Sequence, residues 1–127
     1  MEKEICLSRV EPELAAQILA GLHTLDPRGL CQPQDIQAMA KAGQCFAATA
    51  PGAQAVYIVK VSNGIAWIDA CKGFGPVDWS LTLLPVIEAQ AKGCAAVGFQ
   101  TKRRGLVKQA KKQGYTVAGY IMRKSLQ

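Results

Sequence analysis

The side chains best suited to bind an anion lie near the C-terminal end of this 127-residue sequence. Lys102, Arg103 and Arg104 are expected in the first turn of a helix that runs to Gln113. Cations are disfavoured there by about 0.3 to 1 kcal/mol each, because the helix dipole is positive at its N-terminus. Free N–H groups and arginines together suit a phosphate. This stretch therefore predicts an anionic ligand.

Charge is unevenly divided along the chain. Residues 1–91 contain six Lys or Arg and nine Asp or Glu, whereas residues 92–127 contain nine Lys or Arg and no acid, which gives the net charge of +6. A helical turn of 100° per residue gathers the cations of the last helix on one side: Arg104, Lys108, Lys111 and Lys112. Such a face is usually an ordinary solvated surface, and alternatively it contacts a nucleic-acid backbone or an acidic protein.

Gly73 and Gly75 form a G-x-G pair directly after a predicted strand. Glycines let the backbone N–H groups approach a phosphate closely. A G-x-G pair alone is weak evidence, since two glycines after a strand more often serve a tight connection. Pro76 also removes one N–H from the cradle.

The cysteines do not form a metal-binding pattern. The five are widely spaced, no C-x-x-C pair occurs, and His23 is the one histidine in the sequence. We expect buried thiols in a reducing cytosol rather than a zinc site. No run approaches the roughly 20 apolar residues of a membrane helix, and the first residues are charged. We therefore expect a cytoplasmic protein that is neither exported by a signal peptide nor membrane-spanning.

The elements that must position these residues begin with a strand and two helices. Glu4–Val10 alternates as a strand does. The first helix begins near Pro12 and is expected to bury Leu14, Ile18, Leu22 and Leu25. The second covers Pro33–Ala42 and stops at Gly43. Three strands follow, over Phe46–Ala50, Ala53–Ser62 and Ile65–Ala70, with Asn63-Gly64 forming the last hairpin turn.

The C-terminal half alternates helices and strands. After a loop at Lys72–Pro76, Asp78 caps a helix expected to bury Leu81, Leu84, Ile87 and Ala91. Pro85 would cost about 3 kcal/mol inside it, so its regular part should begin near Leu83 or Leu84. A strand at Ala95–Gln100, a helix that Thr101 caps and a strand at Thr116–Met122 complete the chain. The length and the 50% hydrophobic content predict a single α/β domain over 1–127, of order β-α-α-β-β-β-α-β-α-β.

This order resembles that of the GNAT-like N-acetyltransferase superfamily. The residue-level likeness lies in Ala91–Lys124, where helix, apolar strand, helix, Gly114-Tyr115 and a strand ending in Met122-Arg123-Lys124 look like the closing elements of that superfamily. More narrowly, GFQTKRRGLVKQAKKQGY is similar to small members encoded by phages and prophages.

The resemblance implies an acyl-CoA-dependent N-acyltransferase with acetyl-CoA as cofactor. It places the pyrophosphate at Lys72, Gly73, Phe74 and Gly75, although Ala70 stands where the family has Arg or Gln. Arg103 and Arg104 would complete a common phosphate-sized hollow.

The resemblance also implies a carboxylate base at Asp69, which could equally be a solvated strand-end residue. Its general acid, a tyrosine four residues before the Gly-Tyr pair, is replaced by Ala110. Tyr57, Tyr115 and Tyr120 could substitute, and Tyr115 is the one we assign.

Two other functions fit the same sequence. One is a non-catalytic protein of this fold that binds a host protein or nucleic acid through the basic helix. The other is a small virion or assembly component that self-associates through exposed apolar patches.

Overall fold

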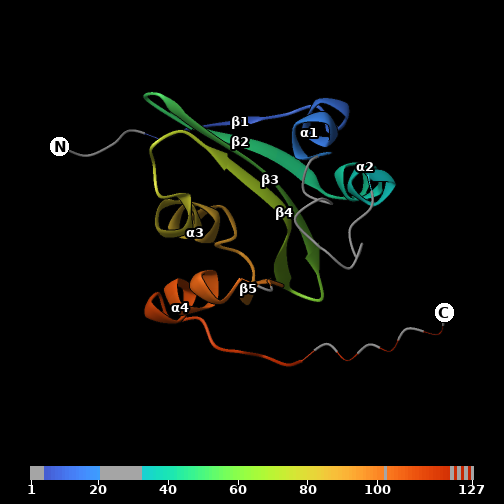
Figure 1. Ribbon diagram of the computed structural model, residues 1–127, viewed down its shortest axis with the longest axis vertical. Coiled ribbons are helices and arrows are strands. Elements are labelled where there is room, and N and C mark those ends of the chain that lie inside the picture. The colour runs from blue at the N-terminus through green and yellow to red at the C-terminus, as the bar shows by residue number, and fades with distance from the viewer. Residues whose placement is uncertain are drawn as a thin grey trace.

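The computed structural model of the protein describes residues 5–20, 33–101, 103–120, 122, 124 and 126 (Figure 1). These residues contain a five-stranded sheet and four helices. In chain order the elements are β1 (Cys6–Arg9), α1 (Pro12–Leu19), α2 (Pro33–Ala42), β2 (Gln44–Ala50), β3 (Ala53–Ser62), β4 (Ile65–Phe74), α3 (Trp79–Gln90), β5 (Ala96–Phe99) and α4 (Arg104–Lys112).

The sheet has the strand order β1-β2-β3-β4-β5. The first four strands are antiparallel neighbours, and β5 pairs parallel to β4 after the crossover through α3. The predicted hairpin between β3 and β4 is confirmed, because Asn63 (φ 53°) and Gly64 (φ 77°) both adopt the positive φ that a tight turn requires. The mixed α/β fold class predicted from the sequence is thus confirmed.

Helices cover both faces of the sheet. Figure 1 shows α1 and α2 on one side and α3 and α4 on the other. The first face buries Ile36 of α2 and Leu19 of α1 against Val56 and Ile58 of β3. The second buries Tyr57 of β3 beneath α3. Alternate residues of β3 therefore anchor both halves of the core, as expected for a strand covered on both sides.

The buried face of α1 is only partly the one that periodicity predicted: Ile18 packs partly buried against the core as expected, but Leu14 does not. Leu14 is 50% exposed, whereas the side chains that pack on the sheet are Ala15, Ala16 and Leu19. The small alanines let the helix axis approach β2 and β3 closely, which turns Leu14 outward. Leu22 and Leu25, like His23 and Cys31, fall outside the described residues.

Helix α3 begins at Trp79, so the predicted late start near Leu83 or Leu84 is wrong, and Pro85 lies inside the helix. The side chains of Pro85 and Leu81 are both exposed. Water can therefore reach the Leu81 carbonyl, which Pro85 has no N–H to bond. The prediction that Leu81 faces inward is wrong, because its side chain lies on the exposed side of α3.

The predicted last strand is not formed. The described residues of Thr116–Met122 have no regular secondary structure, and Tyr120 and Met122 are 87% and 89% exposed. A strand needs a partner edge as well as a suitable sequence, and the described residues after Tyr115 are all exposed. Consequently β5 forms the edge of the sheet.

The two faces of α3 predict different costs for the same substitution. Leu84→Ala should lower the free energy of unfolding by about 2–5 kcal/mol, because Leu84 is 6% exposed. Leu81→Ala on the solvent side should change it by about 0.5 kcal/mol or less, because Leu81 is 44% exposed. Urea unfolding of both variants measures the difference, and equal losses would contradict this orientation of α3.

Candidate functional site

The most distinctive feature of the sheet is an open edge on β4. Strand β4 pairs with β3 along its whole length, whereas its ladder with β5 ends at the Ile68–Phe99 pair. Asp69–Phe74 consequently has no strand on the β5 side within the described part of the chain. Backbone N–H and C=O groups along such an edge are free to bond an extended ligand.

Asp69 lies at a β-bulge where this open edge begins. Ile58 of β3 faces Ala70 and Val59 faces Ile68, which leaves Asp69 as the extra residue of β4. A bulge bends the strand and redirects a side chain, and bulges occur often beside active sites. Burial raises the pKa of the Asp69 carboxyl, and the nearby Lys60 ammonium partly offsets the rise. Asp69 is therefore a partly buried carboxyl that takes up a proton more readily than an ordinary one.

The predicted glycine loop is only partly a loop. Lys72, Gly73 and Phe74 are the last residues of β4, so the prediction that a loop begins at Lys72 is wrong. The cause is pairing, since β3 continues opposite them and Gly73 faces Ala55. The Lys72 ammonium lies 5.3 Å from the centre of the Phe74 ring, within the range of a cation–π contact.

Both glycines have structural reasons to be glycine. A Cβ on Gly73 would overlap the Trp79 ring. That ring is fixed by its Nε1–H, which donates a hydrogen bond to the Phe74 carbonyl at 3.0 Å. Gly75 has φ +89°, and a Cβ there would overlap the backbone of Gly52. The Trp79 ring therefore fills the space beside Gly73 in the turn between β4 and α3.

The start of α4 offers free hydrogen-bond donors. Its N-cap is Arg103, and no side chain caps the helix. Thr101, predicted as the cap, instead accepts a hydrogen bond on its Oγ1 from the Arg103 N–H at 3.0 Å. The first N–H groups of the helix remain open beside the exposed side chains of Arg103 and Arg104. This combination suits an anion. Lys102, predicted in the same turn, lies outside the described residues.

The two predicted phosphate-binding regions do not converge on one small hollow, which corrects the sequence expectation. Gly73 lies five residues beyond Ile68, about 16 Å along the strand. Figure 1 shows α4 beginning beside β5, while the turn from β4 into α3 lies at the other end of β4. The two regions therefore flank the open edge, which is the geometry of a long ligand rather than of one phosphate.

Tyr115 is placed apart from Asp69. Its hydroxyl donates a hydrogen bond to the Glu88 carboxylate at 2.8 Å, and its ring centre lies 5.6 Å from that of Phe99, on the α3 side of the sheet. Asp69 instead interacts with Lys60, which the alternation of β3 puts on the α1 and α2 side. Burial and Glu88 both raise the pKa of Tyr115, so its phenol holds its proton.

The other two tyrosines differ in exposure. Tyr57 is fully buried, its hydroxyl donates a hydrogen bond to Gln90, and burial raises its pKa to about 12. Tyr120 is almost fully exposed. Neither position matches that of a proton donor at the open edge of β4.

The described cysteines differ in exposure: Cys45 is buried and Cys71 and Cys94 are partly covered, but Cys6 is exposed, so the expectation of a buried thiol is wrong for Cys6. Burial raises the pKa of the Cys71 thiol to about 11, which keeps the reactive thiolate scarce at neutral pH. No group of three or more potential ligands among the described residues could hold a metal ion. No helix of the described segments has the length and apolar character needed to cross a membrane.

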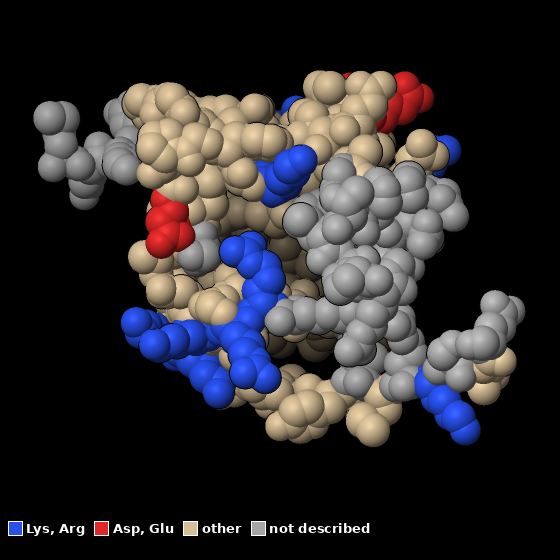
Figure 2. Space-filling view, in the orientation of Figure 1, with Lys and Arg blue, Asp and Glu red and all other residues tan. Residues whose placement is uncertain are grey.

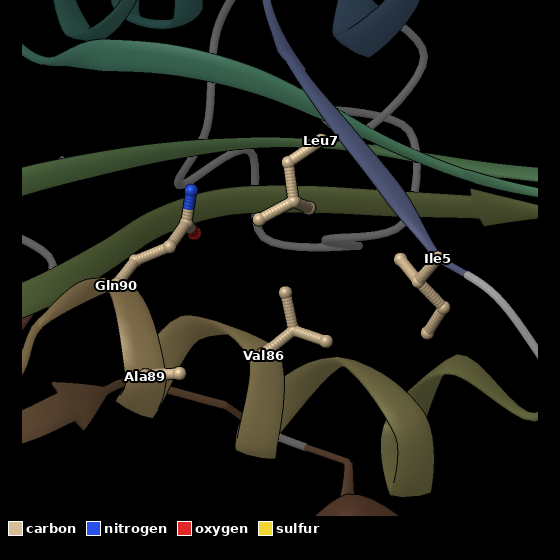
Figure 3. A pocket seen from close by; sticks show the side chains of 5 residues that line it. All are labelled: Ile5, Leu7, Val86, Ala89 and Gln90. Atoms are coloured by element: carbon tan, nitrogen blue, oxygen red, sulfur yellow. The ribbon is translucent and has the colours of Figure 1, made fainter.

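A groove between β1 and α3 was not predicted. It has a volume of about 380 Å³ and is lined by Ile5, Leu7, Val86, Ala89 and Gln90. Figure 3 shows Ile5 and Leu7 facing Val86 across it, with the Gln90 amide at one end. The alternation of Ile5 and Leu7 was visible in the sequence, but their pairing with α3 depends on tertiary structure. The open edge and the bulge of β4 were likewise missed, because no local signal tells where β5 stops.

Comparison with solved structures identifies the fold. The chain superimposes on a putative acetyltransferase of the GNAT family from Xanthomonas campestris pv. campestris with a TM-score of 0.55 and 16% identity, covering 97% of this chain and 94% of that one. AAC(6')-Iy, solved in complex with the bisubstrate analog CoA-S-monomethyl-acetylneamine, gives 0.51 and 14%, covering 98% and 99%. A ribosomal-protein-alanine N-acetyltransferase from Brucella melitensis biovar Abortus 2308 gives 0.51 and 10%, covering 95% and 100%.

The sequence comparisons add no closer relationship. No protein-family model matches the chain, and no curated protein does. The structural matches, at identities of 10–16%, show that this chain has the GNAT acetyltransferase fold.

The packing of Trp79 on Gly73 yields a direct test. Gly73→Ala should lower the free energy of unfolding by about 1–3 kcal/mol, because the added methyl displaces the Trp79 ring. Gly93→Ala is the matched control, since a Cβ there would have no atom within 4 Å. Thermal and urea unfolding measure both variants. A Gly73→Ala protein as stable as the control would show that Trp79 does not rest on this glycine.

Proposed function

We propose that the chain is an acyl-CoA-dependent N-acyltransferase, working in the cytoplasm as one domain over 1–127. The observation that carries the proposal is the open edge of β4, six residues long, within a fold shared with GNAT acetyltransferases. Of the structures with this fold, AAC(6')-Iy was solved with a CoA-containing bisubstrate analog. None of the comparisons bears on the resemblance to phage and prophage proteins, which stays a prediction.

The donors present fit the chemical groups of CoA. Its pantetheine arm contains amides, which can bond the outward-facing backbone groups of Asp69–Gly73. Its nucleotide end carries a pyrophosphate and a ribose phosphate close together, so one anion-binding region can hold that end while the pantetheine arm extends along the open edge. Arg103 and Arg104 stand at the uncapped start of α4, and Lys72, Gly73, Phe74 and Gly75 lie at the other end of the open edge.

Some features of the glycine turn weaken its part in phosphate binding. Pro76 contributes no N–H, and the Asp78 carboxyl group directly precedes α3, where its negative charge opposes a phosphate. The start of α4 contains neither a proline nor an acidic residue. We therefore assign the larger share of phosphate recognition to Arg103 and Arg104.

Asp69 is the group that we assign to the acceptor amine. Acetyl-CoA would supply the acyl group as a thioester. The amine must lose a proton to attack, and a carboxylate with a raised pKa at the edge of the gap between β4 and β5 is suited to take it. The departing thiolate needs a proton in turn. Tyr115 is the donor predicted from the sequence; for this role its hydroxyl has to leave Glu88 and reach the gap between β4 and β5 from the α3 side of the sheet, apart from Asp69.

Titration calorimetry with acetyl-CoA tests cofactor binding. The wild-type chain should bind saturably, and the Arg103→Ala/Arg104→Ala variant should bind at least tenfold more weakly, because charged hydrogen bonds to phosphate are lost. Arg9→Ala/Lys41→Ala removes the same charge from β1 and α2, where both side chains are exposed, and should bind like the wild type. No heat and no thermal shift with millimolar acetyl-CoA would overturn the proposal.

Substitution of Asp69 tests the reaction itself. Asp69→Asn should lower kcat by about 10²- to 10⁴-fold without changing acetyl-CoA affinity. Chromatography of the CoA released with a panel of primary amines measures the rate. The wild-type rate should rise with pH through a pKa above the ordinary aspartate range, because burial raises that pKa, and the variant should lack this rise.

Stability provides the control for this variant. A carboxyl whose pKa is raised by folding contributes its stability at low pH and loses it as the pH rises through the folded-state pKa. Asp69→Asn should therefore lose no stability at pH 7. An unchanged kcat in a folded Asp69→Asn protein would exclude Asp69 as the base, as would an equal loss in the distant Glu13→Gln.

A further inference from the structure

Helix α4 carries an exposed row of cations that acyl-CoA binding does not use in full. Their side chains fall within about 100° of the helix circumference and span about 12 Å of its length. The row consists of Arg104, Lys108, Lys111 and Lys112, all exposed. Figure 2 shows Lys and Arg gathered over α4, whereas the acidic atoms visible on this face lie over α3 and at the upper edge.

The cations of this row have no counter-charge. The last acid in the sequence is Glu88, which already accepts a hydrogen bond from Tyr115. None of the four side chains is paired with a carboxylate in the described part of the chain. Within the helix, Lys108 stands four residues from both Arg104 and Lys112, so like charges are neighbours. The helix dipole favours Lys111 and Lys112 in the last turn of α4, but no carboxylate of the described residues offsets the repulsion among the four cations, whereas a bound polyanion would.

The opposite side of α4 limits what the partner can be. Ala110 is buried, and Leu106 and Val107 are partly covered, so the apolar side of the helix is turned toward the protein. An amphipathic helix that inserts into a membrane needs that side free. The exposed side also has no large apolar residue that could anchor a protein interface.

We propose that this row binds the phosphodiester backbone of duplex nucleic acid without reading its sequence. A duplex presents a dense line of phosphates to which several lysines can bind at once, with release of counterions. No aromatic side chain lies on the exposed side of α4 to stack on bases, so contacts to the backbone account for the binding. Lys108, Lys111 and Lys112 distinguish this surface from the CoA-binding residues.

Fluorescence anisotropy with two 30-bp duplexes of unrelated sequence tests the proposal between 50 and 200 mM NaCl. Both should bind equally, with a slope of log affinity against log salt near −3.6 for four phosphate contacts. In the triple variant Lys108→Gln/Lys111→Gln/Lys112→Gln the slope should be shallower by about 2.7. Over this salt range that corresponds to a roughly 40-fold smaller change in affinity. Glutamine keeps a helix propensity similar to that of lysine, and circular dichroism checks that α4 is retained.

Arg9→Gln/Lys41→Gln/Lys60→Gln is the control, because it removes three exposed cations from β1, α2 and β3. It should keep the wild-type slope. Equal effects of the two triple variants would overturn the proposal, since net charge alone would then explain binding. Tighter binding of poly-glutamate than of duplex at the same salt would overturn it in favour of an acidic protein. With saturating acetyl-CoA present, duplex binding should still require Lys108, Lys111 and Lys112. The test of duplex binding therefore does not depend on the proposed enzyme activity.

Discussion

The unequal pairing of β4 is the constraint on which the rest of the molecule depends. On one side β3 pairs with every residue of this strand except Asp69, and on the other β5 pairs with only four. Backbone groups that lose water must find another partner, so the unpaired stretch has to remain accessible to solvent or to a ligand. The bulge at Asp69 falls where the second ladder stops, and the bend that it introduces helps the two strands part.

Packing at the far end of β4 keeps that stretch extended. Trp79 rests on Gly73 and bonds the Phe74 carbonyl, so the first residue of α3 is fixed to the last residues of the strand. Tyr57, beneath α3, is bonded to Gln90 at the other end of the helix. These contacts hold α3 over one face of the sheet while leaving the outer edge of β4 uncovered. The candidate site is thus a consequence of how the core is packed.

The C-terminal third contributes more positive charge than buried hydrophobic side chains. Val117, Tyr120, Met122 and Leu126 are exposed, and α4 contributes Ala110 as its one buried residue. Conversely, every acidic residue of the chain precedes Lys92. Positive potential therefore concentrates on α4 and at its open N-terminus. The two proposed ligands, acyl-CoA and duplex nucleic acid, would both use this concentration, the first at the start of the helix and the second along its exposed side.

Local periodicity, turn chemistry and composition were enough to predict the order of elements up to α4, the Asn63-Gly64 hairpin and the position of the basic helix. Tertiary contacts set which side of α1 and α3 is buried, how far β4 extends, and why the described residues of Thr116–Met122 form no strand. Asp69 and Tyr115 likewise fell on opposite faces. The reason is that strand length, register and burial are set by partners distant in sequence, which local patterns do not encode.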